Sequence, residues 1–189
     1  AIDSNGNIYV TGYTYGGLDG NTNIGSYDVI LLKYNSSGTK QWTQQLGTTS
    51  GESGSGVAVD SNGNVYVAGS TLGGLDGNVN TGLGDIFLVK YNASGTKQWT
   101  KQLGTSAMDV VRDPAIDSSG DVYVAGQTAG GLDGNTNVGS YDIFLVKYNS
   151  SGTKQWTKQI GTSSDDLSHR IAIDSNGNIY VTGYTYGGL

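Results

Sequence analysis

The sequence of 189 residues contains no cysteine, one proline and one histidine, and only 14% of its residues are charged. Without cysteine, the chain has no disulfide scaffold, no thiolate metal site and no cysteine nucleophile. No uninterrupted apolar run approaches the roughly 20 residues that a membrane-spanning helix needs. The 16 acidic residues outnumber the 10 basic ones, and the net charge of −6 disfavours nucleic acid as a partner, because phosphate backbones bind clustered Lys and Arg.

The scarcity of charge does not indicate disorder. Disordered chains are highly charged and poor in aromatic residues, whereas this chain has 13 tyrosines and 3 tryptophans beside its 32 glycines. It therefore has enough apolar surface to form a core.

An internal repeat organises the whole chain. The segment that begins at Ala1 recurs, with small changes and at a constant interval, from Ala58, Ala115 and Ala172. The repeat units are therefore residues 1–57, 58–114 and 115–171, followed by a partial unit at 172–189, and we treat them as one domain. The partial unit repeats residues 1–18 letter for letter.

Each unit is predicted to form short strands, because apolar residues alternate with polar ones between clusters of turn residues. In the second unit the expected strands are residues 57–60, 64–71, 85–91 and 96–103. Ser61-Asn62-Gly63 predicts a tight hairpin between the first two strands, because Asn and Gly tolerate positive φ. Four short antiparallel strands in each of several tandem units are typical of the blades of a β-propeller.

Three segments of the second unit resemble the bacterial β-propeller repeat family called SBBP, whose name refers to seven blades. They are NVYVAGST at residues 64–71, DIFLVKYN at 85–92 and KQWTKQLG at 97–104. The resemblance covers essentially the whole chain. It implies an all-β fold with about three and a third four-stranded antiparallel blades, as part of a large exported bacterial or archaeal protein on the cell surface or outside the cell. It implies little about activity, because functions in that family are mostly undefined.

Three units and a partial fourth cannot close a ring that usually needs about 4 to 8 blades. One interpretation is that the chain is an excerpt of a longer propeller. The other is self-association, in which the terminal strands of one copy complete a blade of another. The duplicated terminal segment favours the excerpt, because it would leave one strand surplus in each hybrid blade.

The long loop between the second and third strands of each unit is a candidate calcium site. Oxygen-bearing side chains alternate along it, and a carboxylate follows a glycine, which is an arrangement suited to a hard cation. The candidate ligands are Asp19, Asn21, Asn23, Asp28, Asp76, Asn78, Asn80, Asp85, Asp133, Asn135, Asn137 and Asp142. The alternative is that these residues only build tight turns, since Asp, Asn and Gly are the usual turn residues.

The segments that join one unit to the next differ most between units. They are residues 52–56, 108–114 and 164–170, and in a propeller they would lie on the same face as the long loops. We expect this face to bind a protein or cell-surface component. Its candidate residues are Asp109, Arg112, Asp113, Asp165, Asp166, His169 and Arg170. The alternative explanation is neutral sequence variation in loops that tolerate substitution.

No catalytic residue is assigned. The sequence has no recurring nucleophile and base, and Asp165 and Asp166 are adjacent, so in an extended chain they point in opposite directions. We therefore expect a non-enzymatic repeat scaffold. The alternative is a lectin-like propeller with one shallow sugar site in each blade. In that case Trp42, Trp99 and Trp156 would stack on sugar rings, and Tyr13, Tyr15 and Tyr27 would add to such sites. Packing of these tryptophans between blades is the competing explanation.

Overall fold

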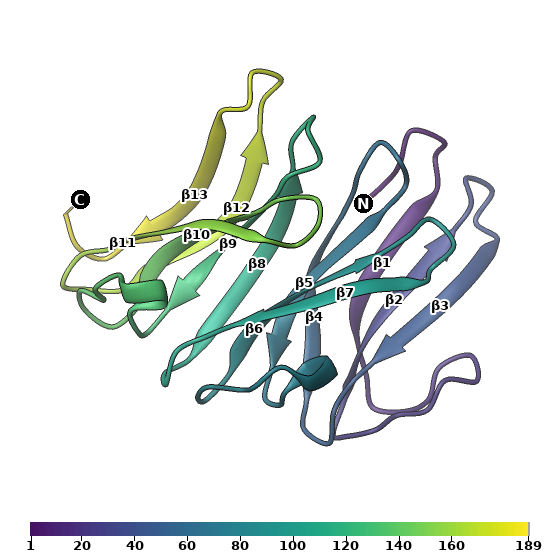
Figure 1. Ribbon diagram of the computed structural model, residues 1–189, viewed down its shortest axis with the longest axis horizontal. Helices are drawn as coiled ribbons and strands as arrows, with labels where there is room; N and C mark the ends of the chain where they lie inside the picture. The colour runs from purple at the N-terminus through teal and green to yellow at the C-terminus, as the bar shows by residue number, and fades with distance from the viewer. Residues whose placement is uncertain (189) are drawn as a thin grey trace.

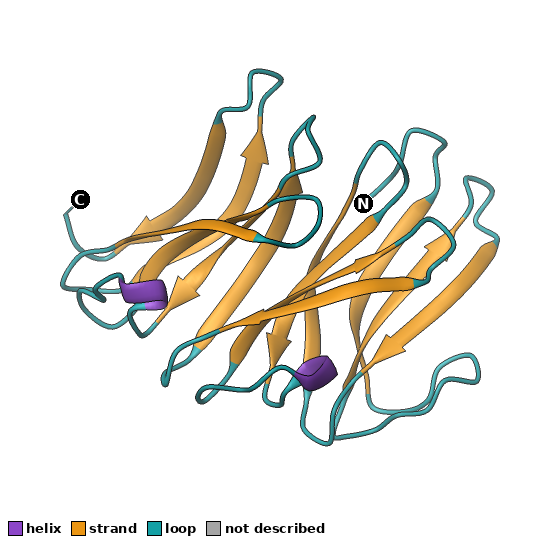
Figure 2. Ribbon diagram, viewed as in Figure 1, coloured by secondary structure: helices purple, strands orange, loops and turns teal. Residues whose placement is uncertain are grey.

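The computed structural model describes residues 1–188, which form thirteen strands and two single-turn 3₁₀ helices (Figure 2). In chain order the elements are β1 (Ile8–Thr14), β2 (Asp28–Tyr34), β3 (Lys40–Leu46), β4 (Glu52–Val59), β5 (Val65–Thr71), η1 (Leu75–Gly77), β6 (Asp85–Tyr91), β7 (Lys97–Leu103), β8 (Asp109–Ile116), β9 (Val122–Thr128), η2 (Leu132–Gly134), β10 (Asp142–Tyr148), β11 (Lys154–Ile160), β12 (Asp166–Ile173) and β13 (Ile179–Thr185).

The strands form consecutive antiparallel sheets with the meander order of propeller blades. Two sheets have four strands, in the orders β4-β5-β6-β7 and β8-β9-β10-β11, while β1-β2-β3 and β12-β13 are shorter sheets at the two ends of the chain. Tight hairpins lie at one end of the sheets, at the top of Figure 1, and the long loops with η1 and η2 lie at the opposite end. The propeller fold predicted from the sequence is confirmed.

The core consists of apolar layers between neighbouring sheets. One layer joins the first sheet to the second and includes Leu31 and Phe87, which are both fully buried. The other joins the second sheet to the third and includes Leu88 and Phe144. Because Phe87 and Leu88 are neighbours on β6, this strand buries both of its faces, as expected for a strand between two other sheets.

Trp42 and Trp99 belong to these contacts between sheets. An added Cβ at Gly95 would lie 3.1 Å from the Trp42 ring, and one at Gly152 would lie 2.9 Å from Trp99, so each ring packs against a turn of the next sheet. Trp99 also lies 6.0 Å from Tyr66, measured between ring centroids. Lysine side chains add polar links across the same boundary.

These lysines are Lys33, whose Nζ donates to the carbonyl of Ala93 at 3.2 Å, and Lys90, whose Nζ donates to the carbonyl of Ser150 at 3.0 Å. Both pairs span sheets at a separation of 60 residues. The repeat in sequence is therefore also a repeat of the contacts that hold the sheets together.

The first strand of each sheet differs from the sequence prediction. β4 begins at Glu52 instead of residue 57, and β8 and β12 begin at Asp109 and Asp166. The variable segments at residues 52–56, 108–114 and 164–170 are therefore mostly strand and not loops. The predicted unit boundaries fall inside β4, β8 and β12, because a sequence period has no intrinsic starting point, whereas a sheet begins where its first strand pairs.

Candidate binding surface

The first strands of successive sheets, β4, β8 and β12, contact one another directly, as the innermost strands of a propeller do. Each of them contains a β-bulge at the same position of the repeat. Ser55 is the extra residue between Gly54 and Gly56, and His169 is the extra residue between Ser168 and Arg170. In β8 the irregularity spans Arg112 and Asp113. A bulge redirects side chains, so these residues project differently from the rest of the strand.

The bulges surround a depression of about 400 Å³. It is lined by Ser55, Arg112, Asp113, His169 and Arg170, which we call the axial cluster. Ser55, Arg112 and His169 occupy equivalent positions in successive repeats. Three innermost strands thus contribute variable side chains to the same hollow, one from β4 and two each from β8 and β12.

The axial cluster carries both arginines and the single histidine of the chain. Arg170 Nη1 donates to Asp113 Oδ2 at 2.6 Å and links β12 to β8, although the Arg170 side chain remains 78% exposed. Arg112 Nη2 makes only a long contact of 3.4 Å with Gln127 Oε1, and Arg112 Nε is buried without a hydrogen-bond partner. The cluster therefore has guanidinium donors that the protein does not use.

The single histidine does not form a catalytic pair. The His169 ring lies 5.3 Å from the Tyr184 ring, and within residues 1–188 it makes no hydrogen bond to a serine or a carboxylate. The axial cluster presents two guanidinium groups and an imidazole beside the carboxylate of Asp113.

Two residues predicted for the binding face lie elsewhere. Asp109 and Asp166 are 0% and 1% exposed, and each accepts the backbone N–H of a turn threonine at 2.6 Å, from Thr105 and Thr162 respectively. They anchor the turn that precedes each innermost strand. Burial raises the pKa of Asp109, despite hydrogen bonds from Thr128 and Thr105.

Asp165 also lies outside the axial cluster. Its backbone carbonyl accepts the N–H of Tyr186 at 3.0 Å, in the turn ahead of β12. The face shared by long loops and connecting turns does exist, because Ser26 N donates to the carbonyl of Ser50 at 2.8 Å. The variable side chains, however, lie on the innermost strands and not on that face.

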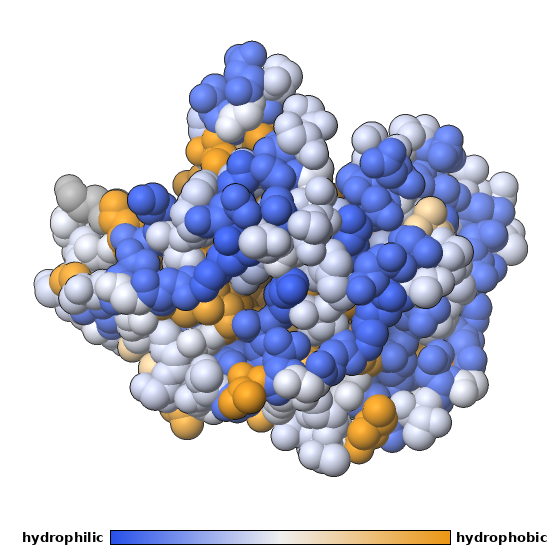
Figure 3. Space-filling model, viewed as in Figure 1, coloured by the Kyte–Doolittle hydropathy of each residue, from blue (hydrophilic) through white to orange (hydrophobic). Residues whose placement is uncertain are grey.

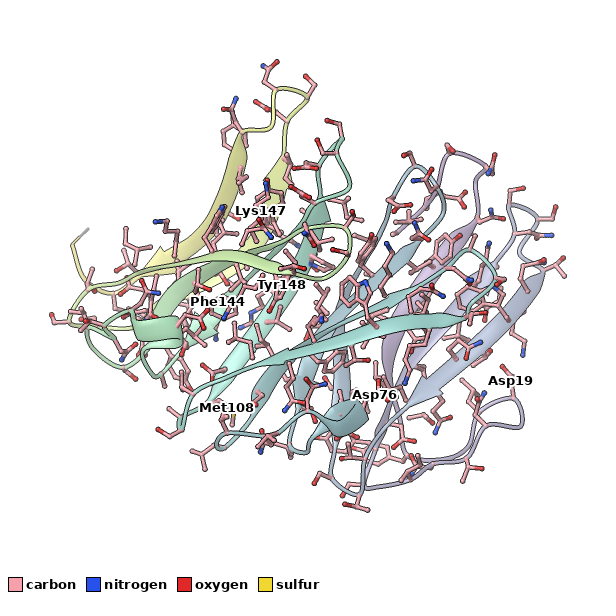
Figure 4. The ribbon with its side chains drawn as sticks, in the orientation of Figure 1. Asp19, Asp76, Met108, Phe144, Lys147 and Tyr148 are labelled. Atoms are coloured by element: carbon pink, nitrogen blue, oxygen red, sulfur yellow. The ribbon has the colours of Figure 1, made fainter. Side chains whose placement is uncertain are left out.

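The candidate calcium loops hold their side chains in local hydrogen bonds. Asp19, at φ 53°, accepts hydrogen bonds from Lys40 and Thr43 of β3, and the same arrangement recurs at Asp76 and Asp133. Asn21 Nδ2 donates to the carbonyl of Leu18 at 2.7 Å, and Asn78 and Asn135 make the equivalent bond. Asp19 and Asp76 lie on separate loops of neighbouring sheets (Figure 4).

The remaining candidate ligands lie nearer the sheets. Asn23 Nδ2 donates to the carbonyl of Gly25 at 2.6 Å, and Asn80 and Asn137 make the equivalent bond. Asp28, Asp85 and Asp142 are buried and accept a hydrogen bond from the glutamine of the outermost strand at 2.9–3.0 Å. Asn23 Oδ1 and Asp28 Oδ1 are buried acceptors without a donor. Within residues 1–188 no group of three acidic or histidine side chains is close enough to hold a metal ion.

One feature of the surface was not assigned from the sequence. Ser55 was not among the predicted binding residues, and its equivalence in position to Arg112 and His169 is the signal that identifies it. The tyrosines named for the lectin-like alternative, Tyr13, Tyr15 and Tyr27, form a cluster whose ring centroids lie 5.4–5.8 Å apart. On the face shown in Figure 3, hydrophobic residues form separate spots on a largely hydrophilic surface.

No helix in residues 1–188 combines the length and apolar character that crossing a bilayer would require.

Two curated proteins are similar to this chain over most of its length. The chain is 32% identical to the regulatory protein FlaEY of Caulobacter vibrioides, over 95% of this chain and 21% of that protein. It is 27% identical to an uncharacterized WD repeat-containing protein, L264, of Acanthamoeba polyphaga mimivirus, over 78% of this chain and 13% of that protein. The chain thus spans about a fifth or less of these curated relatives.

A solved structure, a protein of unknown function from Bacteroides caccae, superposes on 82% of this chain and 48% of its own, with 13% identity and a TM-score of 0.48. The family described as Beta-propeller repeat, SBBP, matches residues 1–19, 41–76, 98–133 and 155–189. Those matches cover most of the chain and recur in every unit, so the chain belongs to the SBBP β-propeller repeat family.

Proposed function

We propose that this chain is part of a non-enzymatic repeat scaffold in an exported prokaryotic protein, and that the axial cluster binds a protein or cell-surface component. One observation carries the proposal. Residues that hold the sheets together are the same in successive units, whereas the bulge position changes from Ser55 to Arg112 to His169. A shared frame with divergent, solvent-facing positions on the innermost strands is the pattern expected of a display scaffold.

The distribution of rare residue types supports the same proposal. All eight lysines occupy positions that recur between units, but the two arginines and the histidine do not recur. They lie together only because three innermost strands meet. The relative named as a regulatory protein is compatible with a role in interactions, although this chain spans only 21% of it.

A photo-cross-linking amino acid placed at Ser55 tests the proposed function. In cells that make the full-length protein, we expect irradiation to attach a defined partner at this position, and mass spectrometry would identify it. The matched control is the same amino acid at Ser119, an exposed residue in the β8–β9 hairpin. Equal products at both positions, or none at Ser55, would contradict the proposal.

The tyrosine cluster favours a second candidate function, carbohydrate binding. Tyr13 and Tyr15 are 51% and 72% exposed, so their rings are open to stacking on a sugar, whereas Trp42 and Trp99 pack between sheets. A glycan array tests this function. We expect any sugar-dependent binding to be lost with Tyr15→Ala and kept with Leu83→Ala, a change of another exposed loop residue. Sugar binding that is unchanged in Tyr15→Ala would refute carbohydrate binding by the tyrosine cluster.

Calcium binding by the long loops is also part of the proposal. The unpartnered oxygens of Asn23 and Asp28 support it, because buried acceptors without donors are the ones that gain most from a cation. If a site is filled to 100 times its dissociation constant, the folded state gains about 2.7 kcal/mol. We therefore predict a higher melting temperature in millimolar calcium than in chelator, and a smaller shift in Asp28→Asn. An unchanged midpoint would refute filled sites.

A further inference from the structure

Resting on the proposed function, we infer that the axial cluster recognises carboxylates of an acidic peptide segment. The cluster brings two guanidinium groups and an imidazole into one hollow, opposed by a single carboxylate, that of Asp113. Guanidinium groups present paired N–H donors in a geometry that matches carboxylate oxygens. We therefore expect the partner to present carboxylate groups to these donors.

Arg112 supplies the strongest argument. Its Nε is buried without an acceptor, and its Nη2 makes only the 3.4 Å contact with Gln127. A donor without an acceptor costs free energy, and a carboxylate in the hollow would offset part of this cost by accepting hydrogen bonds from the guanidinium of Arg112. The guanidinium of Arg112 therefore has hydrogen-bonding capacity left for an anion.

Arg170 offers a second point of attachment. Within residues 1–188 its Nη1 alone is engaged, by Asp113, and the side chain is largely exposed. The guanidinium thus retains free donors while Asp113 holds it in place. Two arginines on adjacent innermost strands can each bind one acidic side chain of the same short peptide segment.

The size and charge of the hollow narrow the class of ligand. Its volume of about 400 Å³ lies near the lower end of the range typical of small-ligand sites, about 300–1,000 Å³, so it suits a few side-chain groups. Two arginines cannot follow a long phosphate backbone, for which proteins use many basic contacts. A short acidic peptide fits both conditions.

Fluorescence anisotropy with a labelled hexaglutamate peptide tests the inference on the full chain. We expect hexaglutamate to bind and the matched hexaglutamine peptide not to bind, and we expect the affinity to fall when salt is raised from about 50 to 500 mM. Arg112→Gln should weaken binding about tenfold or more, because it removes a charged hydrogen-bond donor. The matched control, Lys158→Gln, removes an exposed charge outside the hollow and should change nothing.

A second variant tests whether a loss of binding in Arg112→Gln could come from misfolding. Arg170→Gln changes a largely exposed side chain, so it should keep the melting temperature and still weaken hexaglutamate binding. Equal binding of both peptides, or equal affinity in both arginine variants and the control, would overturn the inference. Preferential binding of an oligonucleotide or a sulfated oligosaccharide would overturn it as well. If Ser55 cross-links a partner but hexaglutamate does not bind, the proposed function stands and the carboxylate inference fails.

Discussion

At the scale of single residues, glycine marks where one strand crowds another. Gly69 and Gly126 occupy equivalent positions on β5 and β9, where an added Cβ would lie 2.2 Å from the carbonyl oxygens of Ser53 and Val110. At Gly12, the same position on β1, an added Cβ would meet nothing within 4 Å. The same repeat position therefore differs between units in its tolerance of a side chain. A neighbouring strand lies beside Gly69 and Gly126, but none lies within 4 Å of a Cβ added at Gly12.

This difference predicts the effect of two matched substitutions. Gly126→Ala should lower the free energy of unfolding by about 2 kcal/mol or more, because the backbone of β8 must move away from the new methyl group. Gly12→Ala should be close to neutral. Urea denaturation of the two variants checks this, and equal losses of stability would contradict the assigned strand positions.

The exposed aspartates of the long loops predict the response to acid. The pKa of Asp19 is lowered by hydrogen bonds from Lys40 and Thr43. At Asp133 burial alone would raise the pKa, but hydrogen bonds from Lys154 and Thr157 outweigh it, so this pKa is also lowered. Because these carboxylates bind protons less readily in the folded state, they stabilise the fold above about pH 4, the ordinary aspartate pKa, and this stability is lost as the pH falls through their lowered pKa values.

The corresponding measurement is the melting temperature as a function of pH from neutral to strongly acidic. It should fall below about pH 4 in the unmodified chain, and the fall should be shallower in Asp19→Asn, because that variant has one less carboxylate to protonate. The control is Asp113→Asn, whose carboxylate belongs to the axial cluster and not to the loops. An identical acid profile in Asp19→Asn would show that this ion pair does not contribute.

At the scale of elements, a tryptophan on the outermost strand of a sheet packs against a turn of the following sheet. Trp99 of β7 packs against the turn at Gly152 in the following sheet, while no turn of a following sheet packs on Trp156 of β11 in residues 1–188. Both rings lie about 6.0 Å from a tyrosine of their own sheet. The two positions therefore differ chiefly in contact between sheets.

Comparing substitutions of Trp99 and Trp156 separates the stability that comes from packing between sheets from the stability that comes from packing within one sheet. Trp99→Ala should cost about 2 kcal/mol, less than the 3–5 kcal/mol of a fully buried tryptophan, because the ring is half-buried. Trp156→Ala should cost clearly less. Chemical denaturation followed by circular dichroism would measure both, and a larger loss at Trp156 would refute the role assigned to Trp99.

At the scale of the whole molecule, the chain is a row of sheets that are stable because each buries its faces against the next. The end sheets differ from the inner ones, since β1-β2-β3 and β12-β13 have three and two strands. Val10 and Tyr180 of these end sheets are exposed, although their counterparts in the inner sheets are buried. Open sheet edges and exposed apolar side chains favour association.

We therefore predict that the isolated 189-residue polypeptide self-associates. Light scattering should give a mass that rises with concentration above that of the single chain. Val10→Lys should reduce association, because it places a charge on the open face, whereas Ile24→Lys, a change of an exposed loop residue, should not. A single-chain mass at every concentration would refute this prediction.

Much of the fold follows from local sequence. Period-two alternation predicts β5 and β6 to within a residue. Ser61-Asn62-Gly63 predicts the hairpin between β4 and β5, where Asp60 accepts the N–H groups of Asn62 and Asn64 at 2.9 Å. These features are local because alternation and turn geometry depend on residues only a few positions apart. The constant interval between repeat units then determines that the pattern recurs.

The tertiary structure alone decides where each sheet begins and what lies at its inner edge. The segment at residues 52–56 is glycine- and serine-rich and has no strand pattern. It becomes the start of β4 because β5 pairs with it and the neighbouring innermost strand β8 packs beside it. Asp109 and Arg112 are close in sequence, but one is buried under a turn and the other faces the axial hollow. Burial and bulge direction depend on contacts between sheets, which no sequence period encodes.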